Sequence, residues 1–197
     1  MWARIKSWLW PQRIEVRVSR FNGKVEVWRY GNQISLRVDG LTQSGGLMEE
    51  IWEKAMKVVY SQQLSVNRIL ILGLGGGTAT KVAKKYWPQA QITGVDIDPV
   101  MVELGKKYLG LKGAKIIISD AVKFVEETEE QFDGILVDVY QGRKIPKAVQ
   151  TQGFINKLKK LGKWIIFNRL KTDKAFREQL NESQVIKTPA NELLLVK

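Results

Sequence analysis

The run Ile69-Leu70-Ile71-Leu72-Gly73-Leu74-Gly75-Gly76-Gly77-Thr78 decides the fold of this 197-residue chain. The apolar residues before Gly73 predict a buried strand, and the glycines predict a tight loop before a helix. Glycine has no Cβ, so the loop can turn sharply and a ligand can approach its backbone. Thr78 stands where the dinucleotide-binding fingerprint has Gly or Ala, and the Gly-Lys-Ser/Thr ending of a phosphate-binding loop is missing.

Strands and helices alternate from this loop to the end of the chain. Strands are expected at residues 68–72, 91–95, 115–118, 134–137, 163–167, 184–187 and 192–196, and helices at 78–87, 98–109, 121–127, 151–161 and 173–180. This order predicts an α/β fold with a doubly wound, mostly parallel seven-stranded sheet. The link between the last two strands is too short for a parallel crossover, so this pair must be antiparallel. The combination resembles the class I methyltransferase fold, a Rossmann-like fold.

The segment before the loop predicts a small β-meander. Apolar residues alternate with polar ones along residues 14–38, and Asn22-Gly23 is a hairpin turn signal. We expect three strands whose apolar face is covered by a dimer partner or by the following domain. A helix follows at 47–60. The predicted domains are therefore residues 1–60, the meander with a linking helix, and residues 61–197, the cofactor-binding domain.

Composition excludes several kinds of chemistry. The chain has neither Cys nor His, which removes thiolate catalysis, Ser-His-Asp triads and Cys- or His-ligated metal sites, and no metal site is predicted. The net charge is +12, with +6 in residues 1–38, −3 in 39–140 and +9 in 141–197. Basic flanks indicate either an anionic partner such as nucleic acid or simply a lysine-rich soluble surface.

No membrane association is predicted. An apolar run of the roughly 20 residues that span a bilayer is missing from the sequence. The basic and apolar stretch at residues 1–11 is too short and too interrupted for a signal peptide. The expected location is the cytoplasm.

Acidic residues lie at or shortly after the ends of predicted strands, at the edge where open α/β sheets bind ligands. Asp96 ends the strand after the glycine loop, where a carboxylate can accept hydrogen bonds from both ribose hydroxyls of a nucleoside. Asp98, which precedes Pro99, is the better helix N-cap by position. Asp120, followed by Ala121, can meet an adenine amino group or can cap the next helix.

Asp138 is the acid nearest to the expected site of chemistry. It ends the fourth strand of the large sheet, beside the glycine loop, where it can receive a proton or hold an amine nucleophile. A structural strand-end role is the alternative. Tyr140 either lines the same cleft or packs, and Asn168 is a weaker candidate.

Several of these motifs together resemble the spermidine synthase family, the polyamine aminopropyltransferases. The resemblance covers most of the chain and rests on residues 38–44, 71–77, 95–98, 119–121 and 132–138. It implies that the nucleoside and reaction site is lined by Gln43, Asp96, Asp120 and Asp138, with Gly73, Gly75, Gly77 and Ala121 beside the cofactor. Two departures concern the acceptor. Gln141 stands where the family usually has a second acid, and Glu49-Glu50-Ile51-Trp52-Glu53 stands where it has Asp-Glu-x-x-Tyr.

The sequence predicts an S-adenosylmethionine-dependent transferase. Methyl transfer to an unidentified small-molecule acceptor is the first interpretation, with Asp138 or Tyr140 orienting or deprotonating the nucleophile. The second is aminopropyl transfer from decarboxylated S-adenosylmethionine to a polyamine. The third is a non-catalytic protein that binds the cofactor or nucleic acid. A homodimer is expected.

Overall fold

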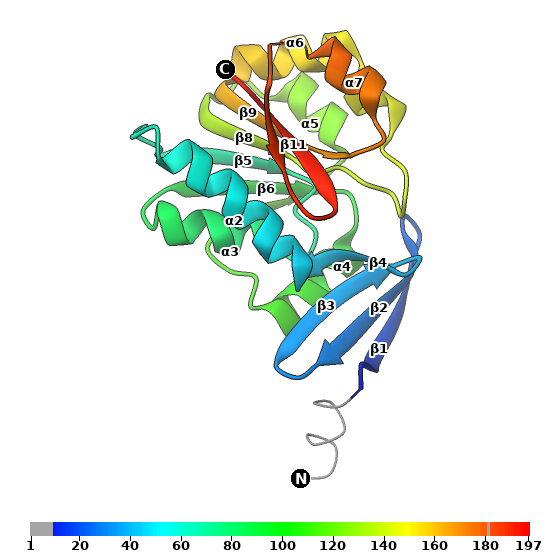
Figure 1. The fold of residues 1–197 in the computed structure, drawn as a ribbon. Helices are drawn as coiled ribbons and strands as arrows, with labels where there is room; N and C mark the ends of the chain where they lie inside the picture. Colours follow the sequence, from blue (N-terminus) through cyan, green and yellow to red (C-terminus); the bar gives the residue numbers. More distant parts are fainter. Residues whose placement is uncertain (1–9, 181) are drawn as a thin grey trace.

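The structure is a computed structural model that describes residues 10–180 and 182–197, and in this part of the chain the strands form two sheets (Figure 1). The large sheet has seven strands in the order β10-β11-β9-β8-β5-β6-β7. Their bounds are β5 Arg68–Leu72, β6 Gln91–Asp96, β7 Lys115–Ile118, β8 Phe132–Val137, β9 Gly162–Leu170, β10 Gln184–Lys187 and β11 Asn191–Val196. The predicted fold class, a doubly wound sheet with a small N-terminal meander, is confirmed.

Strand directions in the large sheet follow from the lengths of the connections. Neighbours among β9, β8, β5, β6 and β7 pair in parallel, each reached through a helical crossover. By contrast, β11 is antiparallel both to β10 and to β9. The predicted antiparallel pair at the end of the chain is therefore confirmed, and β11 inserts between its hairpin partner and the parallel strands.

Helices cover both faces of the large sheet (Figure 1). On one face lie α2 (Leu47–Tyr60) and α3 (Thr78–Tyr86), and on the other lie α5 (Ala121–Glu127), α6 (Gln152–Leu161) and α7 (Lys174–Gln179). A short 3-10 helix, Lys147–Gln150, precedes α6. Because side chains alternate along a strand, Ile69 and Ile71 enter the core under α2 and α3, whereas Leu70 and Leu72 enter the opposite one.

The helix predicted at 98–109 has two parts. An α-helix, α4 (Pro99–Leu104), continues into a π-helical turn at Gly105–Leu109. At Gly105 a Cβ would lie 2.6 Å from the Cα of Gly76, so the glycine loop can pack directly against this turn only because Gly105 has no side chain.

The small sheet has four strands instead of the predicted three. They are β1 (Gln12–Ser19), β2 (Gly23–Tyr30), β3 (Gln33–Val38) and β4 (Leu41–Gly45), each antiparallel to the next. The extra strand β4 carries one aliphatic residue, Leu41, and so lacks the alternation that reveals a strand in sequence. The apolar face of this sheet packs on Met101 and Leu104 of α4, so the following domain covers it, one of the two predicted solutions.

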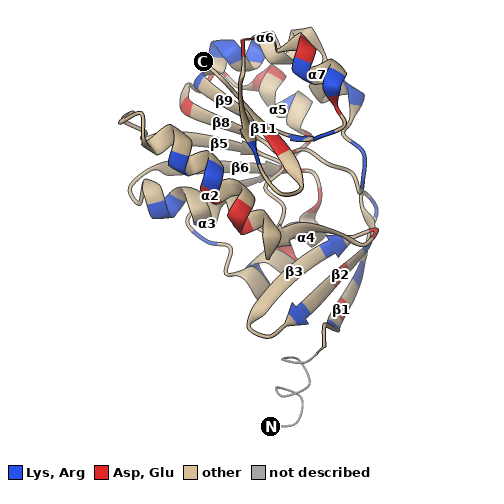
Figure 2. Cartoon of the chain, viewed as in Figure 1, with Lys and Arg blue, Asp and Glu red and all other residues tan. Residues whose placement is uncertain are grey.

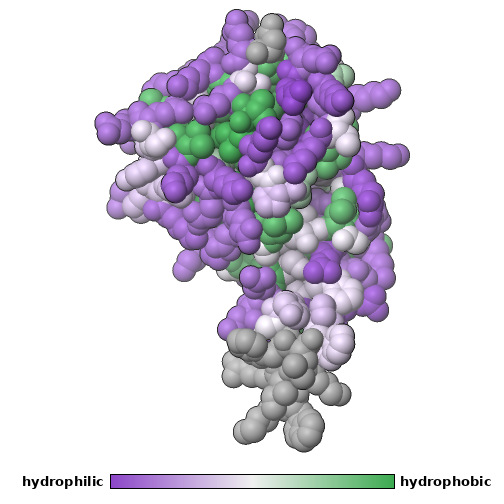
Figure 3. All heavy atoms as spheres, viewed as in Figure 1, coloured by the Kyte–Doolittle hydropathy of each residue, from purple (hydrophilic) through white to green (hydrophobic). Residues whose placement is uncertain are grey.

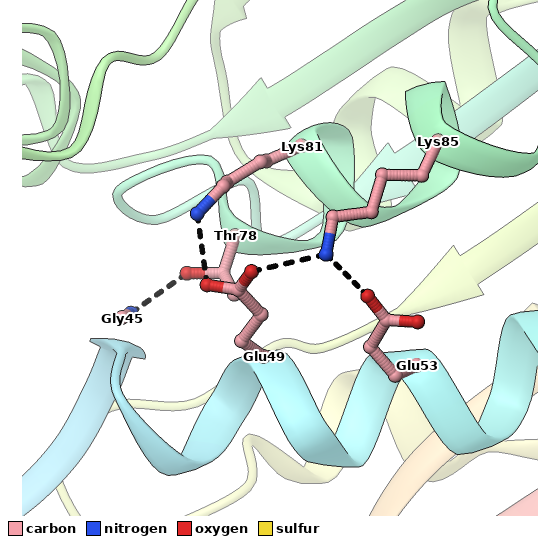
Figure 4. A network of polar contacts seen from close by, with 6 residues as sticks. All are labelled: Gly45, Glu49, Glu53, Thr78, Lys81 and Lys85. Carbon is pink, nitrogen blue, oxygen red and sulfur yellow. Dashed lines mark hydrogen bonds and ion pairs between the residues drawn. The ribbon is translucent and has the colours of Figure 1, made fainter.

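Charged side chains join α2 to α3. Figure 4 shows Glu49 accepting hydrogen bonds from Lys81 and Lys85, at 2.9 and 3.2 Å, while Lys85 also pairs with Glu53. In the same view Thr78 accepts the backbone N–H of Gly45 at 2.7 Å. Helix α2 thus packs on the large domain while following the small sheet in sequence, and we keep the division after residue 60 as a proposal, with α2 as the linking helix.

The surface carries mixed charge. On the face in Figure 2, Lys and Arg are spread over α2, α3, α6, α7 and the small sheet, with Asp and Glu between them. Hydrophobic residues reach the same face mainly over the large sheet, among hydrophilic ones (Figure 3). No helix of residues 10–180 and 182–197 has the length and apolar character needed to cross a membrane.

Candidate active site

A cleft of about 490 Å³ lies at the carboxyl ends of the parallel strands. Its floor is made by the residues that follow β5, β6, β7 and β8, and by the end of β9. The strand β4 and the start of α2 form its wall on the side of the small sheet. The position agrees with the rule that open α/β sheets bind ligands beyond the carboxyl ends of their strands.

The register of the central strands brings three predicted site residues together. Leu72 of β5 lies opposite Val95 of β6 and opposite Val137 of β8. The next residue on each strand is Gly73, Asp96 or Asp138. The glycine loop therefore begins between the two carboxylates, and all three residues line the cleft.

The surroundings of residue 73 leave room only for glycine. Its φ of 82° lies in the left-handed region, and a Cβ at this position would overlap the carbonyl oxygen of Asp138. The N–H of Asp138 in turn donates to the carbonyl of Leu72 at 2.8 Å. The first glycine thus lets the strand ends of β5 and β8 lie in direct contact.

The N–H groups of the glycine loop are already used within the protein. Gly73 and Leu74 donate to the carbonyl of Val95, and Gly77 donates to that of Leu74. Gly75 donates to the Asp96 carboxylate at 2.6 Å, and Gly76 donates to the Ser44 hydroxyl at 2.8 Å. A negatively charged group would have to displace one of these acceptors to bind the backbone of residues 73–77.

Asp96 holds the loop and faces the cleft. Besides the bond from Gly75, it accepts the backbone N–H of Asp98 at 2.8 Å. Burial raises the pKa of Asp96 to about 6, against the effect of these two hydrogen bonds, and the neighbouring Asp98 charge raises it further. Each oxygen has a protein donor and a second lone pair, so the carboxylate can still accept hydroxyl groups of a ligand.

Asp98 is the N-cap of α4, as predicted. Its fully buried carboxylate accepts the N–H of Val100 at 2.9 Å. It also accepts the Ser19 hydroxyl at 2.5 Å and the Asn22 amide at 2.7 Å. The β1–β2 hairpin is thereby fixed to the residue that in turn donates to Asp96, and Asn22 itself lines the cleft. The pattern of the sequence contained no signal for these long-range partners.

Asp120 is the N-cap of α5. One oxygen accepts the N–H groups of Val122 and Lys123, at 2.8 and 3.0 Å. The carboxylate is exposed and lines the cleft with Ala121, which is buried. The two predicted roles are compatible in space, since capping uses one oxygen and a ligand amino group can approach the other.

Asp138 ends a row of hydrogen-bonded side chains. Asn191, at the start of β11, donates to the side-chain oxygen of Asn168 on β9, and Asn168 donates to Asp138, both at 2.7 Å. Burial raises the pKa of Asp138 to about 6, against hydrogen bonds from Asn168 and Trp52, and the charge of Asp96 adds to the rise. The hydrogen bond from Asn168 holds the carboxylate in position, and the raised pKa makes it a better proton acceptor than an ordinary Asp.

Tyr140 and Gln43 also line the cleft. The Tyr140 hydroxyl donates to the carbonyl of Asn168 at 3.1 Å, and burial, with the Asp138 charge, raises its pKa. Tyr140 therefore stays protonated and suits a positioning role better than the predicted role in deprotonation. Gln43 donates to the carbonyl of Gly142 at 3.1 Å and so ties β4 to the segment after β8.

Two hydroxyl residues connect the glycine loop and α3 to the small sheet. Ser44 receives the N–H of Gly76, and Thr78 receives that of Gly45. Thr78, which breaks the dinucleotide fingerprint, thus anchors the small sheet to the start of α3. Among the residues that the structure describes, no group of His, Cys, Asp and Glu is placed to hold a metal ion.

Comparison with known proteins identifies close similarities. A family model described as "Spermine/spermidine synthase domain" matches residues 50–166. A curated polyamine aminopropyltransferase from Sulfurisphaera tokodaii is 35% identical over 71% of this chain. A Drosophila melanogaster homologue of the eEF1A lysine and N-terminal methyltransferase is 40% identical over 36% of the chain. A spermidine synthase solved with the transition-state analogue AdoDATO has a TM-score of 0.76 at 14% identity, over 94% of this chain and 73% of its own, which shows the shared fold.

The lengths differ between this chain and its curated relatives. The chain spans half of the Sulfurisphaera protein and 11% of the Drosophila one. The matched family region, in contrast, contains the glycine loop and all three acids Asp96, Asp120 and Asp138.

Proposed function

The chain belongs to the spermine/spermidine synthase family, and from this premise we propose that it transfers an aminopropyl group from decarboxylated S-adenosylmethionine to an amine. This is the second of the interpretations made from the sequence. The curated polyamine aminopropyltransferase matches about twice as much of the chain as the methyltransferase homologue does. Methyl transfer, the first interpretation, is therefore the second candidate.

The hydrogen bonding of the backbone N–H groups in the glycine loop is the observation that favours the decarboxylated donor. Intact S-adenosylmethionine carries a carboxylate on its amino acid tail, whereas the decarboxylated form ends in an ammonium group. All N–H groups from Gly73 to Gly77 already donate within the protein, so this part of the loop offers no free donor to a carboxylate. Asp138 lies beside the loop, and its negative charge further disfavours a carboxylate on the tail of the donor.

The residues of the cleft fit an adenosyl group. The cleft volume lies in the range of small-molecule sites. We assign Asp96 to the two ribose hydroxyls and Asp120 with Ala121 to the adenine, and we assign Gly73, Gly75 and Gly77 to the backbone bend beneath the ligand. Gln43 holds the wall of the cleft. The donor supplies a sulfonium centre, whose adjacent carbon is already activated, so the task of the protein is positioning.

We assign Asp138 to the acceptor amine. Its carboxylate attracts the ammonium form and takes a proton from it, and the nitrogen lone pair freed in this way forms the new N–C bond as the C–S bond breaks. The bonding electrons stay with sulfur, which leaves neutral 5′-methylthioadenosine. Asn168 keeps Asp138 oriented, and Tyr140 keeps Asn168 in place through its carbonyl.

A comparison of the two donors tests this proposal. Purified protein is incubated with a mixture of amines and, in parallel, with decarboxylated or intact S-adenosylmethionine, and the nucleoside products are identified by mass spectrometry. The proposal expects 5′-methylthioadenosine together with an amine heavier by one aminopropyl group. Formation of S-adenosylhomocysteine from the intact donor, without aminopropyl product from the other, would establish methyl transfer in its place.

A further inference from the structure

The strand order divides the cleft into two halves. The residues that follow β5, β6 and β7 form the nucleoside half, with Asp96 and Asp120. The ends of β8 and β9 and the start of β11 form the other half, which we call the acceptor half. Asp138 lies at the boundary, and the acceptor half is lined by Tyr140, Gln141, Arg143, Leu170 and Asn191.

The acceptor half carries little negative charge. Three carboxylates line the cleft within the described part of the chain, and Asp96 and Asp120 belong to the nucleoside half. Asp138 is thus the carboxylate available to an acceptor there. The other charged residue that lines this half is Arg143, a cation. Gln141, which lies between Asp138 and Arg143 in the sequence, is a neutral amide.

A short turn holds Gln141 and Arg143 at the cleft. Gln141 and Lys144 exchange both backbone hydrogen bonds, at 2.8 and 3.0 Å. The Arg143 guanidinium donates to the carbonyl of Asp39 at 3.1 Å. Together with the bond from Gln43 to Gly142, this contact fastens the turn to the small sheet, so the guanidinium stays beside the acceptor half.

Carboxylates on neighbouring elements do not line the cleft. Glu49 and Glu53 of α2 pair with Lys81 and Lys85 of α3 and are not lining residues of the cleft (Figure 4). Glu192 of β11 pairs with Arg177 at 3.5 Å. Asp39 lies close to Gly142 but is likewise not a lining residue.

We infer that the acceptor half binds an amine with a single ammonium group, at Asp138, and that the rest of the acceptor is uncharged; this inference rests on the proposed aminopropyl transfer. A diamine with one ammonium group at Asp138 would leave its second one in the part of the cleft that is lined by Gln141 and Arg143, where no lining residue of the described chain is a carboxylate. Gln141 and Arg143 are exposed, so the second ammonium group could stay hydrated, but it would be repelled by the like charge of Arg143 with no carboxylate to offset the repulsion. A neutral chain meets Leu170 and the amides of Gln141 and Asn191 without this cost.

Amine binding tests the inference apart from turnover. Isothermal titration calorimetry measures the dissociation constants of n-butylamine and 1,4-diaminobutane for the protein saturated with 5′-methylthioadenosine. The wild type is expected to bind the monoamine about tenfold more tightly, since the second charge of the diamine meets a cation instead of an anion. Equal or tighter binding of the diamine would overturn the inference.

Two Gln→Glu variants make the test specific to position. Gln141→Glu adds a carboxylate beside Arg143 and is expected to shift the binding ratio at least about tenfold toward the diamine. Gln91→Glu adds the same charge at the amino end of β6, away from the cleft, and is expected to keep the wild-type ratio. An unchanged ratio in Gln141→Glu, or an equal shift in Gln91→Glu, would contradict the role of Gln141.

The same samples separate this inference from the proposed function. If the monoamine binds more tightly but no aminopropyl product forms with either amine, the proposed reaction is wrong and the charge selectivity of the cleft stands. If the diamine binds more tightly and is also the better aminopropyl acceptor, the reaction stands and the inference is wrong.

Discussion

The carboxylate of Asp96 accepts the backbone N–H of Gly75 at 2.6 Å and so joins the end of β6 to the glycine loop after β5. The bond places a carboxylate beside a loop in which every residue from 73 to 77 except Leu74 is a glycine. It also uses one of the N–H groups that an anion would otherwise bind. We therefore propose that Asp96 favours a ligand with hydroxyl groups at this position and that the loop does not favour an acidic one.

Gly73 is expected to tolerate no side chain. In Gly73→Ala the methyl group would overlap the carbonyl of Asp138 in a left-handed backbone conformation, so the free energy of unfolding should fall by at least about 2 kcal/mol. Gly153→Ala is the matched control, because nothing lies within 4 Å of a Cβ there, in α6. Urea denaturation of both variants measures the difference. Equal stability of the two variants would contradict the close approach of β5 and β8.

Asp138 should make both activity and stability depend on pH. Its folded-state pKa of about 6 lies above the ordinary value of about 3.9, so folding favours the protonated form. This contribution to stability is complete below about pH 4 and is lost as the pH rises through 6. Asp138→Asn has no carboxyl group to ionise. This variant should therefore be more stable than the wild type between pH 4 and 7, by at most about 3 kcal/mol.

The same variant has the opposite effect on activity. The aminopropyl transfer rate of the wild type should rise with pH through about 6, as Asp138 becomes ionised. Asp138→Asn should be slower by roughly 10²- to 10⁴-fold and should lose this rise. Thermal unfolding and initial rates, measured in the same buffers, test both statements. A variant that is slow yet keeps the rise near pH 6 would assign that pKa to another group.

Asn22 should act on the nucleoside site through Asp98. Asn22→Ala removes a donor from a buried carboxylate, which should lower the free energy of unfolding by about 1–3 kcal/mol and weaken nucleoside binding. Asn32→Ala, in the next hairpin turn of the same sheet, is the control and should change neither property. Equal effects of the two substitutions on stability and on nucleoside binding would contradict a specific role of Asn22.

Local patterns in the sequence predicted most elements of the fold. The glycine loop, the short link between β10 and β11 and the alternation in β1–β3 each depend on neighbouring residues, and all were confirmed. The strand β4 was missed because its burial comes from Ser44 and Gly45, which carry no hydrophobic period. The π-helical turn after α4 packs against Gly76, a contact that the residues of the helix do not reveal.

The candidate site was predictable where its residues follow strands. Asp96, Asp120 and Asp138 could be placed because the carboxyl ends of parallel strands meet at one edge. The partners that fix them come from far along the chain: Ser19 and Asn22 reach Asp98, and Asn191 reaches Asn168. Such contacts depend on tertiary packing, and no spacing rule contains them.

Binding of 5′-methylthioadenosine to three forms of the protein tests the central claim most directly. Calorimetry should give one site per chain in the wild type. Asp96→Ala should weaken the affinity by roughly 100-fold, because two hydrogen bonds to a charged acceptor are lost, and Asp96→Glu should restore part of it. If wild type and Asp96→Ala bind equally at matched folded fractions, the nucleoside does not lie at Asp96 and the assignment of the cleft is wrong.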